Sequence, residues 1–243
     1  MSWIGLLLVG VGVTDLVFSV RPSRVLPEVL GSAAAVLLAL AADLTGPGDL
    51  LALAFVVAVV LAWGQTVTWG LGQGPPWVPL VVLGSGLTVL LLVSGAAGPA
   101  GGLVATWLDG TSLTVLDDYD ADRAMLLLGV LLVQLSTGNV LVRLVLAATH
   151  TVNPARHGTP SDPGTRLKGG RLLGPMERLF IVCLGLAGQV TAASIVVAAK
   201  GLLRFPELQS RRDQERIHRL TEYFLVGSFA SWLVALAGLV LLG

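Results

Sequence analysis

Long apolar runs make up most of this chain, and short polar or Gly/Pro-rich stretches separate them. A membrane-spanning helix needs about 20 consecutive, mostly apolar residues, because the hydrocarbon core of a bilayer is about 30 Å thick. Runs of this length predict candidate spans at 3–20, 26–44, 50–70, 77–97, 124–149, 174–200 and 222–242. The predicted fold is therefore all-α, an integral membrane helical bundle of about seven transmembrane helices. It forms a single polytopic domain over residues 1–243.

Composition supports this prediction. The chain is 54% hydrophobic and 12% charged, whereas a soluble domain carries about 25% charged residues. Its net charge of zero gives no electrostatic reason to expect a nucleic-acid partner. A single cysteine excludes an intrachain disulfide and a cysteine-based metal site. Thirteen of the 15 basic residues are Arg, which is typical of a high-GC bacterium. We therefore expect a multi-pass protein of the bacterial cytoplasmic (inner) membrane, with the lipid bilayer as its main partner.

The connecting segments bear on orientation. The sequence has an acidic loop at 98–122, a basic linker at 150–173 and a basic surface segment at 201–221. Basic loops favour the cytoplasmic side, so seven simple crossings place one of the last two segments on the wrong side. Either 174–200 crosses fully, or it dips into the membrane and returns. Arg178 and Lys200 are 22 residues apart, about 33 Å of helix, which favours a full crossing.

Polar residues at helical spacing are the first site candidates. If 174–200 is one helix, then Arg178, Gln189 and Lys200 share a stripe with small residues. This stripe is either a packed interhelical seam or the lining of a pocket. In the span 124–149, Asn139 and Arg143 share a second stripe. It could hold a lipid phosphate, a carboxylate or a small anion. Its other interpretation is a structural contact of Arg143 with a headgroup or with Glu177.

Carboxylates near span ends give the remaining candidates. Asp15 lies inside the first span, and it is either an interfacial residue near Arg21 or a proton- or cation-handling group. The run from Asp118 to Asp122 alternates aspartates, but it lacks the Gly and Glu that a calcium-binding EF-hand loop requires. We interpret it as the N-terminal cap of the next helix. The tryptophans lie mostly near span ends, as in an aromatic belt. We predict no metal, no cofactor and no catalytic residue.

The C-terminal part carries a resemblance. The stretches GRLLGPMERLFIVCLGLAGQVTAASIVVAAKGLLRFPEL and TEYFLVGSFASWLVAL resemble the end of an uncharacterised family of bacterial polytopic membrane proteins, described as a domain of unknown function. The likeness covers the last quarter to third of the chain, with Gly201 where the pattern has Ser. It implies a bacterial membrane location and no biochemical activity. The charged or amide positions that it marks are Glu177, Arg178, Gln189, Lys200, Arg204 and Glu222.

Three functions are compatible with these features. The first is a small transporter or permeation pathway, which we favour. The second is a scaffold or assembly subunit of a larger membrane complex, with a membrane protein partner or a homo-oligomer. The third is a membrane enzyme acting on a lipid-linked substrate. The enzyme is the least favoured, because no nucleophile, phosphate loop or metal motif is present in the sequence.

Overall fold

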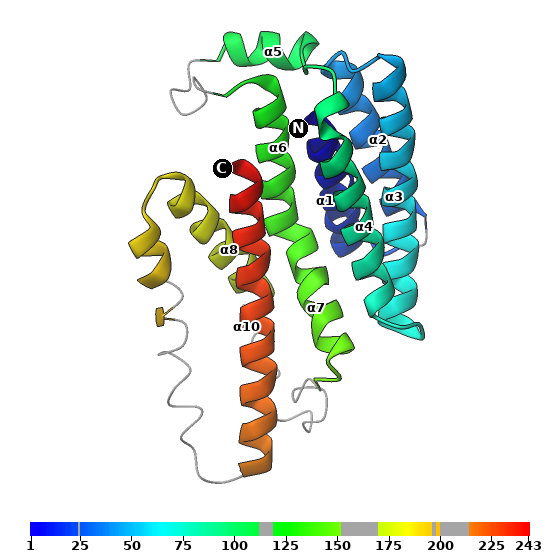
Figure 1. Cartoon of the computed structure of the whole chain (residues 1–243). Helices are drawn as coiled ribbons and strands as arrows, with labels where there is room; N and C mark the ends of the chain where they lie inside the picture. Colours follow the sequence, from blue (N-terminus) through cyan, green and yellow to red (C-terminus); the bar gives the residue numbers. More distant parts are fainter. Residues whose placement is uncertain (24, 112–118, 152–169, 196–197, 200–213) are drawn as a thin grey trace. The chain divides into compact units, whose positions relative to one another are not determined.

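The fold is all-helical in a computed structural model that describes residues 1–23, 25–111, 119–151, 170–195, 198–199 and 214–243. The chain divides into two compact units, Met1–Val140 with Leu242, and Leu141–Leu241 with Gly243. The helices are labelled in Figure 1. Their bounds are α1 Ser2–Val20, α2 Leu26–Ala41, α3 Pro47–Gly72, α4 Trp77–Val93, η1 Ser94–Ala96, α5 Gly102–Asp109, α6 Ala121–Leu132, η2 Val133–Thr137, α7 Gly138–Ala148, α8 Gly170–Leu186 and α10 Gln214–Leu242.

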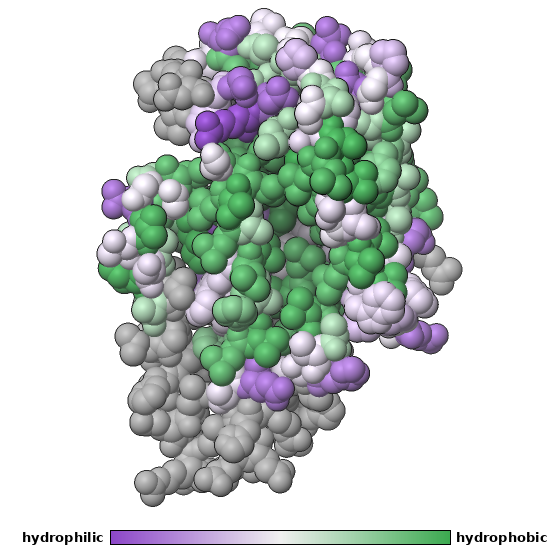
Figure 2. Space-filling view, viewed as in Figure 1, coloured by the Kyte–Doolittle hydropathy of each residue, from purple (hydrophilic) through white to green (hydrophobic). Residues whose placement is uncertain are grey.

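Among the described residues, five helices are long and apolar enough to cross a membrane. They are α1, α3, α4 continued by η1, the continuous helix Ala121–Ala148, and the Thr221–Leu242 part of α10. The predicted helical membrane bundle is confirmed, but the count of seven spans is not. Two helices are shorter: α2 has 16 residues and α8 has 17, or about 24 and 26 Å at 1.5 Å per residue. Hydrophobic side chains cover most of the visible surface of α4 and α10 (Figure 2).

The first unit is built around α1. This helix contacts α2, α3, α4, α6 and η2, and nearly all of its residues from Ser2 to Asp15 are buried. Glycines let the backbones approach: a Cβ on Gly129 would lie 2.7 Å from Leu8 Cβ, and one on Gly12 would lie 2.7 Å from Leu132 Cβ. Small residues serve this purpose in membrane helices, where association depends on close packing. The sequence therefore places α1 at the centre, with its polar residues facing protein.

Local signals explain several helix ends. Pro27 and Pro47 lie in the first turns of α2 and α3, where a missing N–H costs nothing. Asp120 caps α6, and its side chain accepts a hydrogen bond of 2.7 Å from the Arg123 N–H. The predicted acidic cap is confirmed. Asp49, in the first turn of α3, accepts hydrogen bonds from the Trp3 indole at 2.8 Å and from the Gly98 N–H at 3.2 Å.

The structure corrects the predicted helix at 174–200. In the second unit α8 ends at Leu186, and helical structure resumes only at 190–195. Gly188 adopts a left-handed φ of 70°. Its N–H bonds to the Gly185 carbonyl at 3.0 Å, and the Gln189 N–H bonds to the Leu184 carbonyl at 2.8 Å. These bonds form a Schellman cap. The predicted stripe therefore does not exist as one helical face, because the cap ends the helix before Gln189.

The chain reverses direction after α8 (Figure 1). The outer face of α8 is apolar, with Leu172, Met176 and Phe180 each more than half exposed. Its inner face carries Glu177 and Arg178, which are buried. Such an arrangement suits a helix surrounded by lipid, because charges in a bilayer face the protein interior. A short helix followed by a reversal favours the second of our two topologies, in which this segment dips into the membrane and returns.

Candidate functional site

Asp15 lies at the centre of a polar cluster inside the first unit. It projects from α1 and is 6% exposed. The Trp63 indole N–H of α3 lies 3.3 Å from one carboxylate oxygen and 3.2 Å from the other. The hydroxyl of Thr137 lies beside the same carboxylate, and Glu28 of α2 acts on it electrostatically. Three other elements thus bring polar side chains to Asp15.

Glu28 is the second carboxylate of this cluster. It lies in the first turn of α2 and is only 2% exposed. Its Oε1 accepts a hydrogen bond of 3.2 Å from the side-chain amide of Gln65 on α3. Its Oε2 is buried and has no hydrogen-bond partner. Gly64 makes room for this side chain, because a Cβ there would lie 2.7 Å from Glu28 Oε1. Glu28 is therefore packed into the bundle at a place shaped for it.

A π-helical segment supplies the third side of the cluster. Val133–Thr137 interrupts the long helix between α6 and α7, and such π-bulges occur frequently at functional sites. The extra residue in the turn lets neighbouring polar side chains face inward, and Gln134 and Thr137 are both fully buried. The Ser136 hydroxyl donates to the carbonyl of Gly12 at 2.7 Å. This bond attaches the segment to α1, one turn before Asp15.

The electrostatics of this cluster are unusual for a membrane bundle. Asp15 and Glu28 carry the same charge, and no Lys, Arg or His is among the groups that act on Asp15. Burial of an isolated carboxylate in an apolar medium is costly unless the group is neutralised or bound to a cation. The hydrogen bonds from Trp63 and Gln65 offset part of this cost. We define Asp15, Glu28, Trp63, Gln65 and Thr137 as the carboxylate centre.

The predicted residues Asn139 and Arg143 are not among the groups that act on Asp15. Asn139 follows the π-helical segment and is half-buried. Arg143 belongs to the second unit and is exposed. The described contacts of Glu177 are with Trp232, whose indole N–H donates to its Oε1 at 2.8 Å, and with the charge of Arg178. The expected Arg143–Glu177 contact is therefore replaced by a contact between α8 and α10.

Glu177 and Arg178 form a second polar cluster, within the second unit. Arg178 is 1% exposed, and its Nη1 donates to the Ser231 hydroxyl at 3.1 Å. The acidic and basic groups here compensate one another, unlike the two acids of the carboxylate centre. Gln189 and Glu222 are exposed, while Lys200 and Arg204 lie outside the described residues. The resemblance-marked positions that the structure brings together are therefore Glu177 and Arg178.

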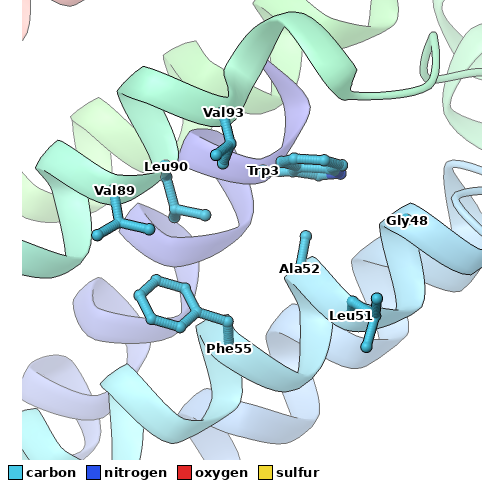
Figure 3. Close-up of a pocket in the computed structure, with 8 residues that line it drawn as sticks. All are labelled: Trp3, Gly48, Leu51, Ala52, Phe55, Val89, Leu90 and Val93. Carbon is cyan, nitrogen blue, oxygen red and sulfur yellow. The ribbon is translucent and has the colours of Figure 1, made fainter.

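An apolar hollow of about 260 Å³ lies between α1, α3 and α4 (Figure 3). Its walls include Trp3, Leu51, Phe55, Val89 and Leu90. The Trp3 indole N–H is already bonded to Asp49, so it offers the hollow no polar anchor. The hollow has the chemistry of a lipid-tail contact and contains none of the predicted site residues.

Sequence reasoning found Asp15 but missed the rest of the carboxylate centre. Glu28 follows a proline at a helix start, where an acidic residue is ordinary helix capping. Trp63 fitted an aromatic belt, yet it is fully buried. The available signal was the presence of both carboxylates inside apolar spans that lack Lys and Arg.

Comparison with known proteins adds no assignment, since no family model, curated protein or solved structure matches the chain.

Proposed function

We propose that this chain is a membrane transport protein that binds and releases a monovalent cation, either a proton or a metal ion, at its carboxylate centre. The observation that carries the proposal is the burial of Asp15 in α1, the helix that the rest of the first unit surrounds, with a second buried acid, Glu28 of α2, acting on it electrostatically. Ionisable groups inside membrane spans are costly and mark ion pathways and proton relays. A purely structural polar contact would not need two acids.

Several features of the centre support cation handling over anion binding. Both charged groups are negative, and the neighbouring hydroxyl of Thr137 can donate or accept a hydrogen bond. The π-helical segment supplies a backbone that can change its hydrogen-bond register during binding and release. The predicted anion site at Arg143 lacks comparable support, because that side chain is exposed.

Transport can be tested in proteoliposomes that contain the purified chain and a pH-sensitive dye. Pulses of acid, sodium and potassium are added outside, and the internal pH and ion content are followed. We expect a cation flux that Asp15→Asn reduces at least tenfold, because the amide keeps the shape and removes the charge. Asp109→Asn is the matched control, since Asp109 is exposed at the end of α5, and it should leave the flux unchanged.

Equal fluxes through wild-type and Asp15→Asn protein would overturn this proposal. So would the absence of any cation flux from a correctly folded and oriented wild-type sample. Folding is checked by thermal unfolding in the same detergent, so that loss of flux and loss of structure are separated.

A role as a subunit of a larger complex is the second candidate. Gln65 is exposed although it lies within the membrane-spanning helix α3, and amide side chains are favoured at helix–helix contacts in membranes. Native mass spectrometry of protein extracted in mild detergent would test this role. A stoichiometric partner protein or second copy supports it, whereas a monomer with bound lipid only contradicts it.

A further inference from the structure

We propose that Asp15 and Glu28 together hold a single proton, and that this proton is the cation of the carboxylate centre. The inference rests on the proposed function and specifies its ion. Binding forms one O–H bond to a carboxylate oxygen, with the proton taken from hydronium, which becomes water. Release breaks this O–H bond, returns the proton to water and leaves both carboxylates ionised. The pair can then take up another proton.

The first argument is the charge around the pair. In the described part of the chain, the elements packed against α1 include α2, α3, α4, α6, η1 and η2. From these elements, Glu28 is the charged group that acts on Asp15. Asp49 of α3 bonds instead to Trp3, near the start of α1. Arg123, in the first turn of α6, lies 14 residues before Thr137, about 21 Å along a helix. Arg21, six residues after Asp15, is exposed, and no described Lys, Arg or His is among the groups that act on Asp15.

The second argument is a count of donors. Trp63 supplies one N–H to Asp15, and Gln65 supplies one to Glu28 Oε1. Thr137 is fully buried, its hydroxyl has no other partner, and it lies beside Asp15. Glu28 Oε2 has no donor at all. One added proton gives that oxygen its missing hydrogen-bond role and removes one of the two charges. Two carboxylates that share a low-dielectric site take up protons as a pair.

The third argument concerns metal ions. The two carboxylates and the Thr137 hydroxyl offer five side-chain oxygens. Calcium takes about six to eight oxygen ligands, so these side chains alone do not complete its coordination. In the described residues, moreover, no group of three or more acidic, His or Cys side chains could hold a metal. A proton needs a single carboxylate oxygen, and Glu28 Oε2 is buried without a hydrogen-bond partner.

Infrared spectroscopy of the full chain in lipid nanodiscs tests the proposal without relying on transport. At neutral pH we expect one carbonyl band from a protonated carboxyl group, which exchange into heavy water shifts. Both Asp15→Asn and Glu28→Gln should alter this same band, and the double variant should lose it. Asp109→Asn should leave it unchanged. If Asp15→Asn or Glu28→Gln does not fold, Asp15→Glu or Glu28→Asp replaces it, and the same band should shift.

Three results would overturn the inference. The first is two bands, each removed by a different variant, because each acid would then hold its own proton. The second is no protonated carboxyl band at neutral pH. The third is loss of the band when sodium is added at constant pH, which would identify a metal cation as the ligand. A shared band in a protein without cation flux would sustain the proton site and refute the transport function.

Discussion

The indole N–H of Trp63 lies within 3.3 Å of both carboxylate oxygens of Asp15, although the two residues are 48 positions apart in the chain. A single donor placed between two acceptor oxygens holds the carboxylate in a fixed orientation inside the first unit. A hydrogen bond to an ionised group contributes about 1.5–3 kcal/mol.

Trp63→Phe should weaken the carboxylate centre without emptying it. An aromatic ring is kept, but the N–H and part of the fully buried indole are lost, so we expect a loss of at least about 1–3 kcal/mol of stability and a lower cation flux. Thermal unfolding in detergent measures the stability, and the proteoliposome assay measures the flux. Trp107→Phe is the control, because that side chain is 60% exposed. Equal effects of the two substitutions would contradict a specific role for the Trp63 N–H.

Gly64→Ala should displace the side chain of Glu28. The new Cβ would lie 2.7 Å from Glu28 Oε1 and 2.8 Å from its Cδ, so the Glu28 side chain must shift. We expect about 1–3 kcal/mol of destabilisation from overpacking and a changed infrared carboxyl band. Gly84→Ala is the matched control: it is also helical, and nothing lies within 4 Å of its Cβ. An unchanged band in Gly64→Ala would show that the packing of Glu28 is not required.

Arg178→Leu should be far more damaging than Arg143→Leu. Arg178 is 1% exposed and bonded to Ser231, and its removal leaves the buried Glu177 without its charge partner. Removal of one partner from a buried pair costs about 3–5 kcal/mol. Arg143 is exposed, and a change there should cost less than about 1 kcal/mol. Comparison of the two melting temperatures checks this prediction, and a larger effect at Arg143 would revive its predicted role.

The basic segments on either side of α8 should lie on the same side of the membrane. Single cysteines at Thr165 and Ser210, placed in a Cys183→Ala background, should react from one side with a maleimide that cannot cross the bilayer. A cysteine at Thr111, in the acidic loop, should react only from the other side. This outcome follows from six crossings, by α1, α2, α3, α4, the helix Ala121–Ala148 and α10, with α8 returning. Labelling of Thr165→Cys and Ser210→Cys from opposite sides would restore the full crossing.

The labelling experiment also tests whether the basic connections share one side of the membrane. With α8 returning, every strongly basic connection falls on one side, as the distribution of Lys and Arg in membrane proteins favours. From the sequence alone, seven full crossings place the basic segments 150–173 and 201–221 on opposite sides, because the apolar run continues through 179–199. The cap at Gly188 depends on a single glycine in the sequence. Glycines are common inside membrane helices, so this one does not by itself predict a helix end.

The amino-acid sequence by itself determined the helical membrane class, the approximate positions of the helices and the acidic cap at Asp120. Each of these depends on neighbouring residues, through hydropathy over one helix length or a side chain bonding its own first turn. Asp15 was also found this way, because a carboxylate in an apolar run is visible without a partner. The same local reasoning placed Trp63 at a membrane interface and left Glu28 unnoticed.

Only the tertiary structure decided which of these polar residues meet. The contacts of Asp15 with Trp63, Glu28 and Thr137 depend on how closely four elements approach, on the glycines that permit it, and on the register change in Val133–Thr137. Helical periodicity specifies a face but not the helix that covers it. The physical reason is that the free-energy cost of burying like charges is offset by contacts distant in sequence, which no local pattern encodes.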